Sequence, residues 1–141
     1  MLVLRNERRR QLRIGRLGSF SFPRGWYLYV GSAFGPGGVA ARCNHHRRIS
    51  ERPRWHIDYL RAQMALREIW FCHGSCRREH QWAAVLAADS AFDEPVTGFG
   101  ASDCSCVTHL FYAPVKPNYG EFHSSIVTLT SDPNETHCEL V

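Results

Sequence analysis

Long apolar runs are missing from this sequence of 141 residues, and lysine occurs only once. No stretch approaches the ~20 apolar residues that a membrane-spanning helix needs. The first ten residues, MLVLRNERRR, hold four apolar residues and then charge, unlike a secretory signal peptide. Internal repeats and low-complexity blocks are absent as well. We therefore expect a cytoplasmic protein that does not bind membranes, with one domain and room for a tail.

The charges are divided unevenly along the chain. Residues 1–80 hold all 16 arginines against five acidic residues, a net charge of +11, whereas residues 81–141 hold one lysine against eight acidic residues, a net charge of −7. A basic half followed by an acidic half indicates a face that binds a polyanion such as nucleic acid. The arginine codons of a GC-rich genome explain the same composition equally well, so composition alone leaves both explanations open.

Six cysteines are present, and without a secretory signal we expect reduced thiols rather than a disulfide framework. Cys104, Cys106 and His109 offer three soft metal ligands in one short segment, and Cys72 and Cys76 offer two more. Neither set has the Cys-x-x-Cys spacing of common zinc sites. If the first segment is a strand, His109 points away from the two cysteines beside it. We therefore prefer small buried thiols over a structural zinc site.

The hydrophobic pattern predicts one mixed α/β (α+β) domain over residues 1–113, in which three helices flank a small mixed or antiparallel sheet. Helices are expected to follow glycine and proline breaks and, for the last of them, to begin after Ser75 as the cap. We expect strands at 12–22 (with a bend), 25–31, 68–72 and 107–112, and helices at 39–48, 55–67 and 75–88. Residues 114–141 have no clear period, so we expect an acidic, flexible tail there.

Two of the predicted helices carry charged residues on their apolar face. In the first helix, Val39 and Cys43 mark that face. Arg42 and His46 share it, at i+3 and i+7 from Val39. An arginine that points inward needs an anionic partner, because burying a lone charge is very costly. His46 taken alone is more often a hydrogen-bonded packing residue than a catalytic one.

Glu79 begins an otherwise apolar stripe of the third predicted helix, in line with Trp82 and Leu86. An arginine partner, a metal ion or a solvated helix end would each explain a carboxylate at that position. Spacing alone favours a plain ion pair with Arg42. Tyr29 lies just before Gly31, where the predicted central strand ends and a glycine loop begins. Together with inward-facing Arg, His and Glu side chains, Tyr29 indicates an open polar pocket.

An ordered set of motifs in this chain resembles the GIY-YIG nuclease family. Tyr29-Val30-Gly31 is similar to the second half of the family signature, and a glycine-rich loop and a helix bearing Arg42 follow it as they do in the family. The likeness extends to a small uncharacterised branch whose members carry YVGSA, WHIDYL and GFGxSDCxCxxHLFY. These motifs lie here at Tyr29–Ala33, Trp55–Leu60 and Gly98–Tyr112. The resemblance covers roughly residues 2–113.

The resemblance implies an activity and a set of roles. It implies an endonuclease that uses Mg²⁺ or Mn²⁺ to hydrolyse phosphodiester bonds in DNA, and a glycosylase fused to some members of the branch favours a role in DNA repair. Tyr29, Arg42 and His46 would be catalytic, and Glu79 would bind the metal. Surface arginines would bind backbone phosphates without reading sequence, unless they only form a solvated charged surface. They include Arg47, Arg48, Arg52 and Arg54.

One feature of the family has no counterpart in this sequence. The family places a GIY tyrosine on its first strand, and in this branch a run similar to Leu2-Val3-Leu4 follows it. Tyr27 is only two residues before Tyr29 and is too close to replace it. One expectation is that the authentic chain starts further upstream and that the first strand is truncated here. The alternative is a catalytically weakened nucleic-acid-binding module that keeps the fold.

Overall fold

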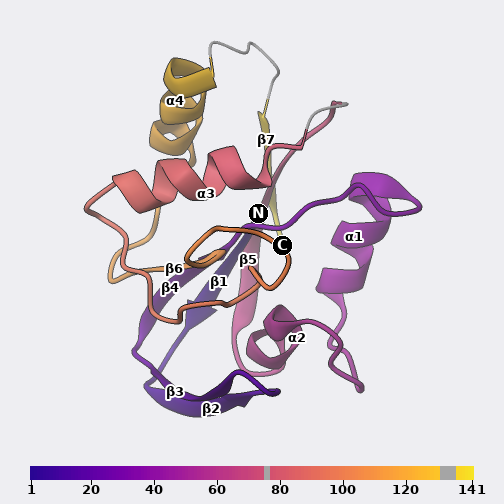
Figure 1. Cartoon of the computed structure of the whole chain (residues 1–141), viewed down its shortest axis with the longest axis vertical. Helices are drawn as coiled ribbons and strands as arrows, with labels where there is room; N and C mark the ends of the chain where they lie inside the picture. Colours follow the sequence, from indigo (N-terminus) through magenta and orange to yellow (C-terminus); the bar gives the residue numbers. More distant parts are fainter. Residues whose placement is uncertain (75–76, 131–135) are drawn as a thin grey trace.

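The computed structural model describes residues 1–74, 77–130 and 136–141, and its centre is a five-stranded antiparallel sheet (Figure 1). The strand order is β6-β4-β1-β5-β7. The strands are β1 (Leu2–Asn6), β4 (Gly25–Tyr29), β5 (Ala65–Cys72), β6 (Leu110–Ala113) and β7 (Thr136–Leu140). The predicted fold class, a small α+β domain with helices flanking a sheet, is confirmed.

Two helices cover each face of this sheet (Figure 1). Side chains of α1 (Gly38–Arg47) and α2 (His56–Arg61) pack on one face, together with Tyr27 and Tyr29 of β4. Side chains of α3 (Glu79–Ala88) and α4 (Tyr119–Thr130) pack on the other face, where the alternate residues of β4 point. The prediction that Tyr27 and Tyr29 point to one face of the sheet and Leu28 to the other is confirmed. None of the helices in the described part of the chain has the length and apolarity to cross a membrane.

Residues 12–22, predicted as one bent strand, instead belong to a hairpin of β2 (Arg10–Ile14) and β3 (Gly18–Phe22). Gly15 and Gly18 have φ values of 48° and 125°, in the region that favours glycine, so the chain reverses between them. Ile14 and Phe22 are fully buried in the core on the α1/α2 face. The hairpin therefore closes one end of the sheet rather than extending it.

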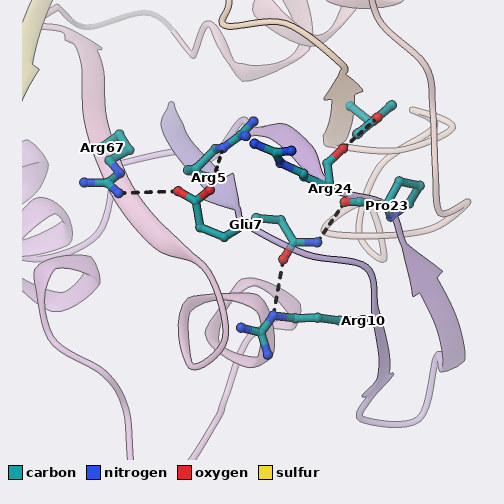
Figure 2. A network of polar contacts seen from close by, with 8 residues as sticks. Arg5, Glu7, Arg10, Pro23, Arg24 and Arg67 are labelled. Atoms are coloured by element: carbon teal, nitrogen blue, oxygen red, sulfur yellow. Dashed lines mark hydrogen bonds and ion pairs between the residues drawn. The ribbon is translucent and has the colours of Figure 1, made fainter.

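Asn6 fastens this hairpin to the sheet at the end of β1. Its side-chain amide is buried and donates hydrogen bonds to the carbonyl oxygens of Phe22 and Pro23, at 3.1 and 2.8 Å. Its side-chain oxygen accepts a hydrogen bond from Arg10 at 3.2 Å. Figure 2 shows this network beside two ion pairs of Glu7. Because both polar atoms of the side chain have partners, in three hydrogen bonds, the buried amide stabilises the connection instead of weakening it.

Three predicted boundaries differ from the structure because strand pairing or loop geometry overrides the local pattern. Residues 65–67, expected in the second helix, belong to β5, since they pair with β1. The third helix begins at Glu79, and its predicted cap Ser75 lies outside the described residues. The last predicted strand begins only at Leu110, so the segment before it is a loop. Cys104, Cys106 and His109 therefore lie in a loop and not on a strand.

The prediction of a flexible tail over residues 114–141 is wrong for the part of it that the structure describes. Helix α4 buries Phe122 and Ile126 against the α3 face of the sheet, and the Tyr119 ring lies 5.4 Å from the Trp70 ring. Strand β7 pairs with β5 along its whole length. The i, i+4 spacing of Phe122 and Ile126 is a core-facing period that turn residues on either side obscure.

The only lysine of the sequence secures the start of this C-terminal segment. Lys116 lies 2.6 Å from a carboxylate oxygen of buried Glu68, which also accepts a hydrogen bond from the Trp70 indole at 2.7 Å. Burial by itself raises the pKa of Glu68, but the hydrogen bonds from Lys116 and Trp70 outweigh it and hold that pKa below its usual value. The C-terminal segment is therefore held to the domain both by apolar packing and by the ion pair of Lys116 with Glu68.

Candidate functional site

The four residues predicted for the site, Tyr29, Arg42, His46 and Glu79, line one cavity of about 250 Å³. The cavity lies where β4 and β5 end and β1 begins, between α1 and the first turn of α3. Its other walls are mainly apolar and include Trp82. The structure thus brings together residues that are up to 50 positions apart in the sequence.

Tyr29 is the last residue of β4 and is 5% exposed. Burial raises the pKa of its phenol, and the nearby positive charge of Arg42 only partly offsets that effect. The phenol is therefore protonated at neutral pH. Such a group orients a bound oxygen by hydrogen bonding, and it does not act as a base without help from another charge.

Arg42 is half-buried on α1 and is held between two aromatic side chains. Its guanidinium carbon lies 4.3 Å from the centre of the Trp55 ring, and its charge lies close enough to Tyr29 to lower the pKa of that phenol. Gly31 leaves room for this pair, because a Cβ there would approach Tyr29 Cε1 to 3.2 Å and Arg42 Nη2 to 3.4 Å. The close packing of Tyr29 and Arg42 therefore explains why position 31 is a glycine.

The ion pair between Arg42 and Glu79, which spacing alone favoured, does not form. Neither residue has an ion-pair partner among the described residues, although both line the same cavity. Glu79 is half-buried as the first residue of α3, and its carboxylate makes no hydrogen bond with another described residue. A half-buried cation and a half-buried carboxylate therefore face one cavity without neutralising each other.

His46 is 2% exposed, and neither ring nitrogen has a hydrogen-bond partner among the described residues. Burial, with further contributions from nearby Arg42 and His45, lowers the pKa of His46 to about 3. The imidazole is therefore neutral at physiological pH. Its two unsatisfied nitrogens are unusual, because buried polar atoms normally have partners.

Asp58 fixes the segment that holds Arg42 in place. One of its carboxylate oxygens accepts hydrogen bonds from the backbone N–H groups of Arg54 and Trp55, at 2.9 and 3.1 Å, and the other lies 3.3 Å from His45. These hydrogen bonds and the histidine outweigh the effect of burial and lower the pKa of Asp58. Trp55, which the WHIDYL motif contained but to which no role was given, is therefore a positioning residue for Arg42.

A second cavity on the other side of Tyr29 and Arg42 is lined by the loop that precedes β6. Gly100 of this loop has a φ of 70°, and a Cβ there would come within 2.8 Å of Tyr29 Cε2. The Gly100 N–H donates a hydrogen bond to His56 Nδ1 at 3.0 Å. His56 and Asp103 line this cavity with Glu79. Neither His56 nor Asp103 was predicted as a site residue, although His56 lies in the WHIDYL motif and Asp103 in the motif at Gly98–Tyr112.

The four arginines predicted to bind DNA fall into different environments. Arg47 pairs with Glu139 of β7, its Nη2 lying 2.6 Å from either carboxylate oxygen. Arg48 and Arg52 are exposed in the connection between α1 and α2. Arg54 is exposed and lines the second cavity. Only Arg54 therefore borders the site, and Arg47 is already engaged within the molecule.

Among the described residues, two groups of side chains lie close enough together to hold a metal ion. The first, His45, His46 and Asp58, uses its carboxylate to cap α2. The second joins His80 of α3 to the three residues noted in the sequence, Cys104, Cys106 and His109. The argument that His109 points away from the cysteines fails, because the segment is a loop and not a strand.

Comparison with known proteins gives a family but no function. A family model described as "Domain of unknown function DUF123" matches residues 1–131, and the chain belongs to that family. No curated protein and no solved structure matches the chain.

Proposed function

We propose that this protein is a metal-dependent endonuclease of the GIY-YIG type, which hydrolyses phosphodiester bonds in DNA. One observation carries the proposal: Tyr29, Arg42, His46 and Glu79 line a single cavity, and Arg42 has no anionic partner among the described residues. The same four residues match the motif of that family in the sequence. Motif and geometry therefore point to one site.

Arg42 is the residue that would bind the scissile phosphate. A guanidinium group donates two parallel hydrogen bonds to a phosphate, and it gains most when it is partly removed from water and already oriented. Trp55 and Tyr29 provide that orientation. In the transition state, when negative charge grows on the phosphate oxygens, a fixed cation next to them lowers the barrier.

Glu79 is the residue that would hold the metal. Its carboxylate is half-buried at the cavity, has no ion-pair partner among the described residues, and shares the second cavity with Asp103. Mg²⁺ prefers such a setting, because it binds through one or two carboxylates and completes its shell with water and substrate oxygens. A bound Mg²⁺ or Mn²⁺ would supply charge neutralisation at the phosphate and the leaving oxygen.

The two remaining residues would act as neutral groups. The protonated phenol of Tyr29 can donate its hydrogen bond to a phosphate oxygen or to the attacking water, depending on where the substrate lies. His46 is neutral at physiological pH, and an unpartnered ring nitrogen can accept a hydrogen bond from that water. With a pKa of about 3 it is a weak base, so its role is to orient the water rather than to store its proton.

The test is a cleavage assay with a panel of DNA substrates that includes duplex, single-stranded, branched and base-damaged forms, each with Mg²⁺, Mn²⁺ or EDTA. We expect nicking of at least one substrate that requires the metal. Arg42→Ala should lower the rate by about 10²–10³-fold, as is typical for loss of a transition-state contact. The matched control is Arg16→Ala, at an exposed arginine that lines neither cavity. Binding without cleavage of any substrate would instead favour a nucleic-acid-binding module.

A further inference from the structure

Four side chains that bind soft metals meet beside the proposed phosphate site, where His109 also lines the second cavity. His80 is the second residue of α3, and Cys104, Cys106 and His109 lie in the loop that precedes β6. One ligand atom of each residue lies within 4.8 Å of the corresponding atoms of the other three. Two segments more than 20 residues apart in sequence thus supply a Cys₂His₂ set.

The distances in this cluster are close to those of a tetrahedral zinc site. In such a site, Zn–S bonds of about 2.3 Å and Zn–N bonds of about 2.1 Å place sulfur and nitrogen ligands about 3.6 Å apart. Cys104 Sγ lies 3.5 Å from His109 Nε2. No separation between ligand atoms in the cluster exceeds 4.8 Å, so none has to shrink by more than roughly 1 Å. Since His80 is exposed and the cysteines are half-buried in a loop, side-chain rotation can provide that movement.

We propose that the protein binds one structural Zn²⁺ through His80, Cys104, Cys106 and His109. Two thiolates and two imidazoles in tetrahedral arrangement select zinc over Mg²⁺, Ca²⁺ or Mn²⁺, which prefer oxygen ligands. With four protein ligands, no position is left open for water or substrate, so the ion stabilises the fold and takes no part in hydrolysis. The irregular Cys-x-Cys-x-x-His spacing is compatible with this site because the loop, not a strand, presents these residues.

The ion would fasten the loop to the first turn of α3. Few regular hydrogen bonds hold residues 98–109, among them those between Gly98 and Val107 and between Phe99 and His109. On one side of the proposed zinc, Gly100 packs against Tyr29; on the other, Glu79 precedes His80 in α3. If the proposed function holds, the ion therefore also fixes the distance between Tyr29 and the carboxylate that binds the catalytic metal.

The experiment measures zinc in the full-length protein, purified without a histidine tag and without added metal. We expect one Zn²⁺ per chain by elemental analysis, retained after dialysis. The variants His80→Gln and Cys104→Ser should each lower zinc affinity more than about 100-fold, the upper range for loss of an outer-shell partner. The matched control, Cys138→Ser, changes a thiol outside the cluster and should keep its zinc.

Replacement of zinc by Co²⁺ gives a second readout that needs no DNA. We expect the visible bands of tetrahedral, thiolate-ligated Co²⁺, which should weaken in Cys104→Ser. His80→Gln tests the proposal even if the cysteine variant fails to fold, because His80 is exposed. A wild-type protein without stoichiometric zinc and without tetrahedral Co²⁺ bands overturns the proposal, as does undiminished zinc binding by His80→Gln. Because zinc content is independent of cleavage, failure of this site and failure of the proposed nuclease are distinguishable.

Discussion

Arg42 is a half-buried cation on α1 that lines the cavity of the proposed phosphate site. The helical period placed it on the inward face of α1, and the structure places its guanidinium group between Trp55 and Tyr29 with no carboxylate beside it among the described residues. A half-buried cation without a protein partner has to be neutralised by water or by a bound anion. This requirement supports the proposal that the cavity binds a phosphate.

The buried His46 predicts how the free energy of unfolding depends on pH. The unfolded chain binds a proton at this histidine below about pH 6.5, whereas the folded protein does so only near pH 3. Its contribution to stability is therefore fully present above pH 6.5 and is lost as the pH falls from 6.5 towards 3. Between pH 7 and pH 5 this single group should lower the free energy of unfolding by about 2 kcal/mol.

The measurement compares denaturant unfolding of wild type and His46→Asn at several pH values between 7 and 5. The variant should lose much less stability over this range than wild type, whatever its stability at pH 7. His137→Asn is the matched control, because an exposed ring is solvated in both the folded and the unfolded chain. Parallel pH dependences of wild type and His46→Asn would mean that His46 is not buried as a neutral group.

At the scale of elements, the clearest prediction concerns α4. Phe122 is 6% exposed and packs against Trp70 and Trp82, with ring centres 5.3 and 5.1 Å away. Phe122→Ala should lower the free energy of unfolding by about 3–5 kcal/mol, as expected for a large buried side chain. Val127→Ala on the same helix, where the side chain is 39% exposed, should cost far less. Equal, small effects in denaturant melts would contradict the packing of α4 on the sheet.

The sequence predicted those features that depend on a local period. Helical spacing placed Arg42 and His46 inward, and strand alternation separated Tyr29 from Val30. The same reasoning failed for β7, because pairing between residues 136–140 and β5 is non-local and leaves no periodic signal. It also failed for the Cys₂His₂ cluster, because loops have no fixed period and His80 comes from a distant helix.

At the scale of the whole molecule, the division between a basic and an acidic half is partly neutralised within the fold. Arg47 of the basic half pairs with Glu139 of the acidic half, so this pair offsets one charge of each excess. The arginines without such a partner are the ones available to a polyanion. Among the four predicted to bind DNA, the exposed Arg48, Arg52 and Arg54 have no ion-pair partner among the described residues, and Arg48 and Arg52 lie away from the proposed site.

Salt dependence of DNA binding tests this assignment. The double change Arg48→Ala/Arg52→Ala should reduce the slope of log affinity against log salt concentration by about 0.9 for each phosphate contact that is lost. Arg47→Ala should reduce it less, because Arg47 is already paired with Glu139. The slopes are obtained from titrations of labelled duplex at several salt concentrations. A larger change for Arg47→Ala than for the double variant would place the DNA on a different surface.

The central claim, a metal-dependent nuclease with Glu79 as the metal ligand, is tested most directly by Glu79→Gln. Cleavage and DNA binding are measured side by side with the best substrate of the panel, in Mg²⁺, Mn²⁺ and EDTA. The change removes the charge and keeps the shape, so the cleavage rate should fall at least about 10²-fold while DNA affinity stays close to wild type. Glu94→Gln, at an exposed position outside both cavities, should cleave like wild type. Undiminished cleavage by Glu79→Gln would contradict the account, as would a wild-type protein that cleaves no DNA with either metal.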